Sequence, residues 1–298
     1  MAAPILADAA IAAPRPALRR SIGIGARPVR LVQNRALAAG GAILIAALLL
    51  AIFAPAIAGV DPRAIMLGDR LLPWSRAHPF GTDMLGRDIF ARILFGTRMS
   101  LLIGGCCAAA SAILGTMIGM VSAAARLADA IVMRILDGVM SIPAVLLAVA
   151  LMAVAGGSAE NVIVAVTIVE TPRCARLVRG LLLSLRERPY VEAAIAAGSG
   201  RIRLFVRHLL PSLMAPLAVQ ATFVWAAAML IEATLSFIGA GVPPSTPTWG
   251  NMIAESKALW QLKPALIFVP AAALSVTILG VNLFGEGLRQ SFDKQAGH

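Results

Sequence analysis

The sequence predicts an all-α polytopic membrane protein with six transmembrane helices and with both chain termini in the cytoplasm. Three features lead to this prediction: the composition, the long uncharged runs, and the distribution of Lys and Arg. Of the 298 residues, 59% are hydrophobic and only 14% are charged, and the mean hydropathy is +0.85. Soluble domains are closer to half apolar and a quarter charged, so the chain is expected to reside in a membrane.

The predicted transmembrane helices are located by runs of uncharged residues, because about 20 apolar residues cross the hydrocarbon core as a helix. Five such runs cover residues 36–60, 99–125, 138–159, 209–231 and 264–285. A sixth and weaker segment, at about 161–183, contains Glu170 and Pro172 and carries three arginines in its last turns. It is counted because, without it, the neighbouring segments would fall on the wrong sides of the membrane.

The orientation follows from Lys and Arg in the connecting segments, since these residues favour the cytoplasmic side. With the N-terminus inside, the cytoplasmic pieces 1–35, 126–137, 173–208 and 286–298 contain eighteen basic residues, against eight in the outer pieces. The predicted plan is therefore a cytoplasmic tail (1–35), a first transmembrane helix (36–60), an outer loop (61–98), a core of five transmembrane helices (99–285) and a cytoplasmic tail (286–298). A polar segment, 186–211, lies on the cytoplasmic side of that core.

Several functions are excluded or disfavoured by what the sequence lacks. The chain has three lysines, and none follows a glycine, so it has no phosphate-binding loop and cannot itself be an ATPase. No His, Asp, Glu or Cys cluster has metal-ligand spacing, and no catalytic triad can be assigned, so neither an enzyme nor a resident cofactor is expected. The net charge of +11 does not indicate nucleic acid, because the basic residues fall between apolar runs. The three cysteines are expected to be packing residues.

Two carboxylates, Glu170 and Glu232, are predicted to lie within the membrane, where ionisable groups are costly unless they are paired or functional. Glu170 precedes Arg173 by three residues, close enough to pair on a helix. Both carboxylates are interpreted as paired or interface-facing groups. No chain of carboxylates across the bilayer is visible, although a proton-driven carrier stays open as an alternative. Ser111, Gly115 and Gly119 recur every four residues and favour close helix packing.

The polar segment 186–211 contains "YVEAAIAAGSGRIRLFVRHLLP", from Tyr190 to Pro211. Glu192 begins a run of good helix formers, and the small Ala193 and Ala194 leave one face smooth enough to lie against another protein. Gly198 then permits a sharp turn. Basic side chains follow, and Pro211 can open the next helix at its first turn. We expect a short helix on the inner membrane face that is offered to a partner.

These residues resemble a known family. "EAAIAAG" followed after nine residues by "HLLP" is similar to the cytoplasmic EAA loop of ABC importer permeases. "HPFGTDMLGRDIFARILFGTRMSLLIG", "CARLVRGLLLSLRERPYVEAA", "EATLSFIGAGVPPSTPTWGNMI" and "NLFGEGLRQSFDK" resemble the C-type permease subunits of dipeptide, oligopeptide and nickel transporters. The likeness covers about residues 35–295. The chain departs from it in "VETPRCAR", where relatives usually carry an aromatic residue near Glu170 and Tyr in place of Cys174.

The resemblance implies a type I ABC importer permease fold in the bacterial inner membrane, forming part of a translocation path for di- or oligopeptides. It implies as partners a second homologous permease subunit, two ABC ATPases that hold ATP and Mg, a periplasmic or lipid-anchored binding protein, and membrane lipids. Nickel, glutathione or another small solute is the alternative within the family. A self-contained carrier or channel is the alternative outside it.

The resemblance also assigns roles to particular residues. The residues implied to couple the chain to the ATPase are Glu192, Ala193, Ala194, Gly198, Arg201, His208, Leu210 and Pro211. The residues expected to organise the periplasmic mouth in the 61–98 loop are Gly81, Thr82, Asp83, Gly86, Arg87 and Asp88. A second outer segment, "GAGVPPSTPTWGNMI", is expected to be stiff because of its three prolines, with Trp249 at the bilayer interface.

Overall fold

The computed structural model describes residues 34–296, and their regular structure is helical apart from one isolated β-bridge. The all-α fold class is therefore confirmed. The long helices are α1 (Arg35–Ala58), α2 (Ile89–Ala124), α5 (Ala159–Arg186), α8 (Leu210–Ile238) and α10 (Ala265–Ala296). Between them lie α3 (Arg126–Met140), α4 (Ala144–Ala155), α6 (Pro189–Ala196), α7 (Arg201–Leu204) and α9 (Trp249–Ser256). The expected tail 1–35 lies outside the described residues except for Asn34 and Arg35, as do the last two residues of the tail 286–298.

The helix ends follow local sequence signals. Side-chain oxygens cap the first turns of four helices, at Asn34, Asp88, Ser158 and Thr248. Each accepts a hydrogen bond from a backbone N–H that the helix itself leaves without a partner. Gly59 and Gly239 follow α1 and α8 with φ angles of 66° and 89°, a left-handed conformation that glycine adopts at low cost.

Within residues 34–296, four helical stretches are long and apolar enough to cross a membrane: Arg35–Ala58, Ile89–Ala124, Phe205–Ile238 and Ala265–Phe292. The expected span 138–159 is not one straight helix. Helices α3 and α4 meet at a 90° bend. The two helices taken together count as a fifth candidate span. Pro143 accounts for the break, because proline lacks a backbone N–H and disfavours helical geometry in the residue before it. Helix α5 carries too many charged residues to qualify as a candidate span by composition. The number of six transmembrane helices therefore stays a prediction.

Helices α2 and α5 pack closely through small residues. A Cβ added to Gly115 would collide with Cys174, and one added to Gly119 would lie 2.8 Å from the Ala175 carbonyl oxygen. The Ser111 hydroxyl donates to the Thr167 carbonyl across the same interface, at 3.5 Å. The stripe of small residues therefore serves packing within the chain, and Cys107 and Cys174 are buried in it.

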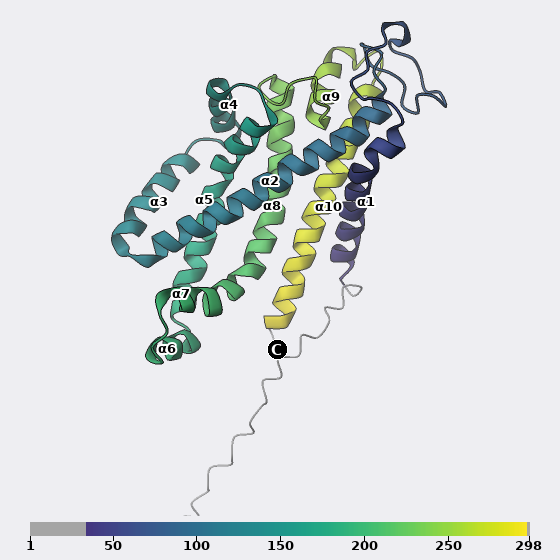
Figure 1. Cartoon of the computed structure of the whole chain (residues 1–298). Coiled ribbons are helices and arrows are strands. Elements are labelled where there is room, and N and C mark those ends of the chain that lie inside the picture. The colour runs from purple at the N-terminus through teal and green to yellow at the C-terminus, as the bar shows by residue number, and fades with distance from the viewer. Residues whose placement is uncertain (1–33, 297–298) are drawn as a thin grey trace, which may run out of the picture. The chain divides into compact units, whose positions relative to one another are not determined.

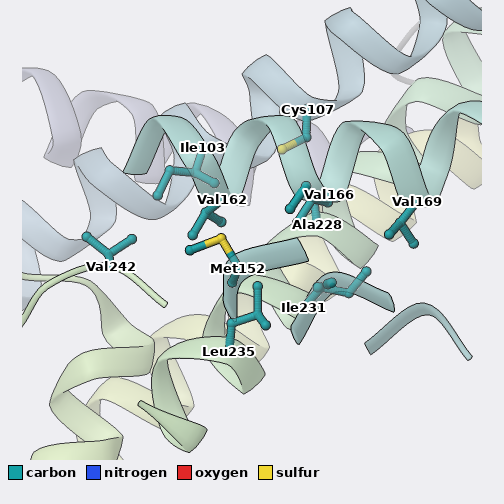
Figure 2. Packing of buried hydrophobic residues seen from close by; sticks show 12 residues of the cluster. Ile103, Cys107, Met152, Val162, Val166, Val169, Ala228, Ile231, Leu235 and Val242 are labelled. Atoms are coloured by element: carbon teal, nitrogen blue, oxygen red, sulfur yellow. The ribbon is translucent and has the colours of Figure 1, made fainter. Parts of the chain in front are cut away.

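The largest apolar cluster among the described residues joins helices α2, α4, α5 and α8. Figure 2 shows Ile103 and Cys107 of α2 beside Val162, Val166 and Val169 of α5, with residues of α4 and α8 completing the cluster. The members from α4 and α8 are Ala148, Met152, Ala228, Ile231 and Leu235. This core fixes the bent helix α4 against the long helices.

The short elements lie at opposite ends of the long helices. Figure 1 places α6 and α7 together at one end of α5 and α8, and α9 at the other end of α8, beside the loop that precedes α2. Trp249, expected at the bilayer interface, is instead 1% exposed and packs against Gly96 at the start of α2. Its ring fills the gap above that glycine inside the protein, and its depth relative to the bilayer interface stays a prediction.

Candidate functional site

Helix α6 is held against the rest of the chain by one fully buried side chain, that of Val191. Val191 packs with the ends of α2, α5 and α8 in a cluster that also contains Ala123, Val178, Leu182, Leu209, Leu213 and Leu217. Pro189 stands in the first turn of α6, where a missing N–H costs nothing. The helix is thereby seated on an apolar base, with its remaining faces turned outward.

The end of α6 is a Schellman motif, which explains Gly198. The backbone N–H of Gly198 donates to the Ile195 carbonyl at 2.9 Å, and that of Ser199 donates to the Ala194 carbonyl at 3.1 Å. Gly198 has a φ of 80°, the left-handed conformation that this motif requires. The sharp turn expected at Gly198 is therefore present, and the chain reverses there into α7.

The face that α6 presents is smooth and carries one charge. Glu192 and Ala193 are exposed, and Ala194 is partly exposed. Ile195 adds an apolar side chain that is 54% exposed. An exposed isoleucine between alanines and one carboxylate is suited to contact with another protein.

The basic part of the segment continues into α8 without a sharp break. A π-helical turn, Phe205–Leu209, joins α7 to α8, and Pro211 occupies the first turn of α8, as expected. His208 and Leu210 are partly buried and Pro211 is exposed. The side chain of Arg201 lies outside the described part of the chain. The segment and the ends of α2 and α5 together line a pocket of about 750 Å³, formed by Met120, Ala124, Leu182, Arg186, Ile195, Ser199, Leu204, Phe205 and Leu209.

At the other end of the molecule, Asp83 and Arg87 belong to a buried ion network. The Asp83 carboxylate accepts from Arg87 Nε and from Arg92 Nη1, each at 2.6 Å. Both arginines also reach Glu255 of α9, at 2.6 and 2.7 Å. The side chain of Arg92 is only 3% exposed. Because buried charges are tolerated only when paired, the network fixes α9 to the start of α2.

The other residues predicted for the mouth also hold this loop together. The Thr82 hydroxyl donates to the Asp69 carbonyl and accepts from the Leu72 N–H, and Asp88 caps α2 while contacting His78 Nδ1 at 2.7 Å. A Cβ on Gly81 or Gly86 would strike the backbone of the outer loop. These residues are brought together as one structured unit. Whether a partner contacts that unit stays a prediction.

The two carboxylates predicted to lie within the membrane are buried, and each contacts a residue of its own helix. Glu170 is 1% exposed and pairs with Arg173 Nη1 at 3.1 Å, as the spacing predicted. Glu232 is 0% exposed and accepts from the Ser236 hydroxyl at 2.9 Å. Their roles in transport stay open.

Sequence reasoning missed several ion pairs between distant parts of the chain. Arg92 and Glu255 complete the outer network, although they are 163 residues apart in the chain. Arg179 forms a bidentate pair with Asp129, joining α5 to α3. In each case the sequence showed only a charged residue beside an apolar run, which indicates that an ion-pair partner is needed. Only the fold identifies that partner.

Comparison with known proteins places this geometry in a family. Residues 115–297 match the family model described as the binding-protein-dependent transport system inner membrane component. The chain belongs to this family. It is accordingly a multi-pass inner membrane component, and the matched region includes α5, α6 and α8 and the last turns of α2. The outer loop and α1 precede the match.

Curated relatives align along most of this inner membrane component. A probable peptide ABC transporter permease protein of Sinorhizobium fredii is 47% identical, covering 86% of this chain and 88% of the relative. A probable D,D-dipeptide transport system permease protein of Escherichia coli is 40% identical, covering 92% of both chains. A dipeptide transport system permease protein of Alkalihalophilus pseudofirmus is 37% identical, covering 89% and 87%.

A solved structure supports the fold. A chain of the MetNI methionine ABC transporter, in inward-facing conformations, superposes with a TM-score of 0.55 at 18% identity. The match covers 67% of this chain and 95% of that chain. The inner membrane component thus has the fold of an ABC importer permease.

Proposed function

We propose that this inner membrane component is a permease subunit of an ATP-driven importer and forms part of a translocation path for di- or oligopeptides. The single observation that carries the proposal is α6, a short exposed helix with the sequence EAAIAAG, seated on Val191 and closed at Gly198. Relatives along 86–92% of the chain are named as peptide or dipeptide permeases, which supports peptides as the solute.

In the proposed assembly, separate ATPase subunits provide the energy for transport. Two ABC ATPases hold ATP and Mg and receive α6 with its flanking residues Arg201, His208, Leu210 and Pro211. A second, homologous permease subunit completes the path. A periplasmic or lipid-anchored binding protein delivers the peptide near the loop organised by Asp83, Arg87 and Asp88. ATP binding moves α6, and because α6 is seated on α2, α5 and α8, that movement is transmitted to the long helices.

Binding of the ATPase tests the docking role directly. Glu192→Lys places the opposite charge on the exposed face of α6, and we expect recovery of the co-purified ATPase to fall about tenfold at equal membrane abundance. Glu160→Lys is the matched control, because Glu160 is also exposed but lies at the opposite end of α5. Full ATPase recovery with Glu192→Lys would remove the docking role from α6.

The solute is tested by uptake in a strain that lacks the transporter. Restoring the complete transporter should restore uptake of dipeptides and short oligopeptides from a panel that also contains nickel and glutathione. Uptake should depend on the binding protein and on ATP. Uptake of nickel or glutathione without peptides would contradict the proposed solute, and uptake by the purified chain alone in liposomes would contradict the proposed class of transporter.

A further inference from the structure

Helix α5 exposes two different kinds of side chain along its length. In its first half the exposed large residues are Val164 and Ile168, at 57% and 44%. In its second half the side chains of Arg173 and Arg176 are 51% and 49% exposed. An apolar surface suits lipid or an apolar neighbour, whereas half-exposed guanidinium groups need water or a polar partner.

Arg173, which the sequence-based orientation counted on the cytoplasmic side, lies in the structure at the depth of the apolar part of α2. Its neighbour Cys174 touches Gly115, which stands within the uncharged run 99–125. At 1.5 Å per residue, Gly115 is about 15 Å from the cytoplasmic end of that run. A charged group at such a depth is costly in hydrocarbon, and exposed ones usually face a water-filled cavity.

The side chain of Arg173 does not turn toward the cytoplasmic end of α5. Its Nη1 donates to Glu170, one turn nearer the start of the helix, at 3.2 and 3.1 Å to the two carboxylate oxygens. An arginine that escaped lipid by extending to the nearer interface would point the other way. The pairing therefore holds the guanidinium away from that interface, where its charge needs water or a polar partner.

Only one nitrogen of this guanidinium is engaged among residues 34–296. Nη1 contacts Glu170, and the Nε and Nη2 groups have no protein acceptor in the described part of the chain. These two donors form the parallel pair that binds a carboxylate in bidentate fashion. One turn further on, Arg176 Nη2 is bound to Asp137 at 2.7 Å, which leaves Arg173 as the more available of the two.

We propose that the Arg173 face of α5 lines the water-filled path and that Arg173 binds the carboxylate of the passing peptide. The proposal rests on the peptide import proposed above. Glu170 orients the guanidinium and offsets its charge, so the peptide would be held weakly enough to leave. The contact requires an anionic group on the solute, a property that distinguishes a peptide acid from its amide.

The test uses the complete transporter and two solutes that differ in one group, alanyl-alanine and alanyl-alanine amide. With Arg173→Gln, we expect acid uptake to fall about tenfold, while amide uptake changes by less than about twofold. Arg173→Lys should recover part of the acid uptake because it keeps the charge. Arg63→Gln, which removes an exposed arginine from the outer loop, should affect neither solute.

A merely structural role for Arg173 would lower uptake of both solutes equally and would overturn the carboxylate contact. If the wild-type transporter takes up neither solute, the proposal of peptide import is rejected, and the proposed carboxylate contact is rejected as well. Water access is measured separately, with Arg173→Cys in a chain whose three native cysteines are replaced. A charged thiol reagent should modify this cysteine in the assembled transporter. A cysteine that stays unmodified would show that this face is not in the path.

Discussion

At the scale of single residues, Gly198 is needed for its backbone conformation and not because a side chain would lack space. Its φ is 80°, and a Cβ there would meet no atom within 4 Å. Gly198→Ala should therefore cost about 1–2 kcal/mol through backbone strain alone, fray the end of α6, and lower ATPase recovery about fivefold or more. Gly200→Ala is the control, because Gly200 lies in equally open space without a positive φ. Equal recovery from the two variants would show that the Schellman turn is not needed for docking.

At the scale of elements, the α2–α5 contact and the outer network each give a prediction about stability. Gly115→Leu would overfill the contact with Cys174 and Ala175 and should lower the free energy of unfolding by about 1–3 kcal/mol. Gly138→Ala, in open space within α3, should be neutral or stabilising. A melting temperature in detergent that is unchanged by Gly115→Leu would contradict the close packing of the two helices.

The outer network is tested at the same scale by Arg92→Met. This change leaves Asp83 and Glu255 with Arg87 as the remaining arginine, and we expect a loss of about 3–5 kcal/mol because buried charges lose a partner. Arg98→Met, an exposed arginine on the same helix, is the matched control. Protease cleavage in the 61–88 loop should increase in the first variant alone. Equal cleavage of both variants would show that the network does not hold α9 to α2.

At the scale of the whole molecule, the orientation in the membrane is the main open prediction. Trp74 is 73% exposed in the outer loop and Ile195 is 54% exposed on α6. In a chain without native cysteines, Trp74→Cys should react with an impermeant thiol reagent in intact spheroplasts. Ile195→Cys should react only after permeabilisation. Thr82 is unsuitable as a labelling site because it is fully buried. The reverse pattern would place both chain ends outside.

The sequence by itself determined the fold class, the position of most long helices, the turn at Gly198 and the Glu170–Arg173 pair. These depend on local quantities: runs of apolar residues, backbone preferences, and spacing along one helix. The tertiary structure alone decided the burial of Trp249 against Gly96 and the joining of Asp83 and Arg87 to Arg92 and Glu255. Such contacts join residues that are distant in the chain, and their energies depend on which surfaces the packing of the helices brings together.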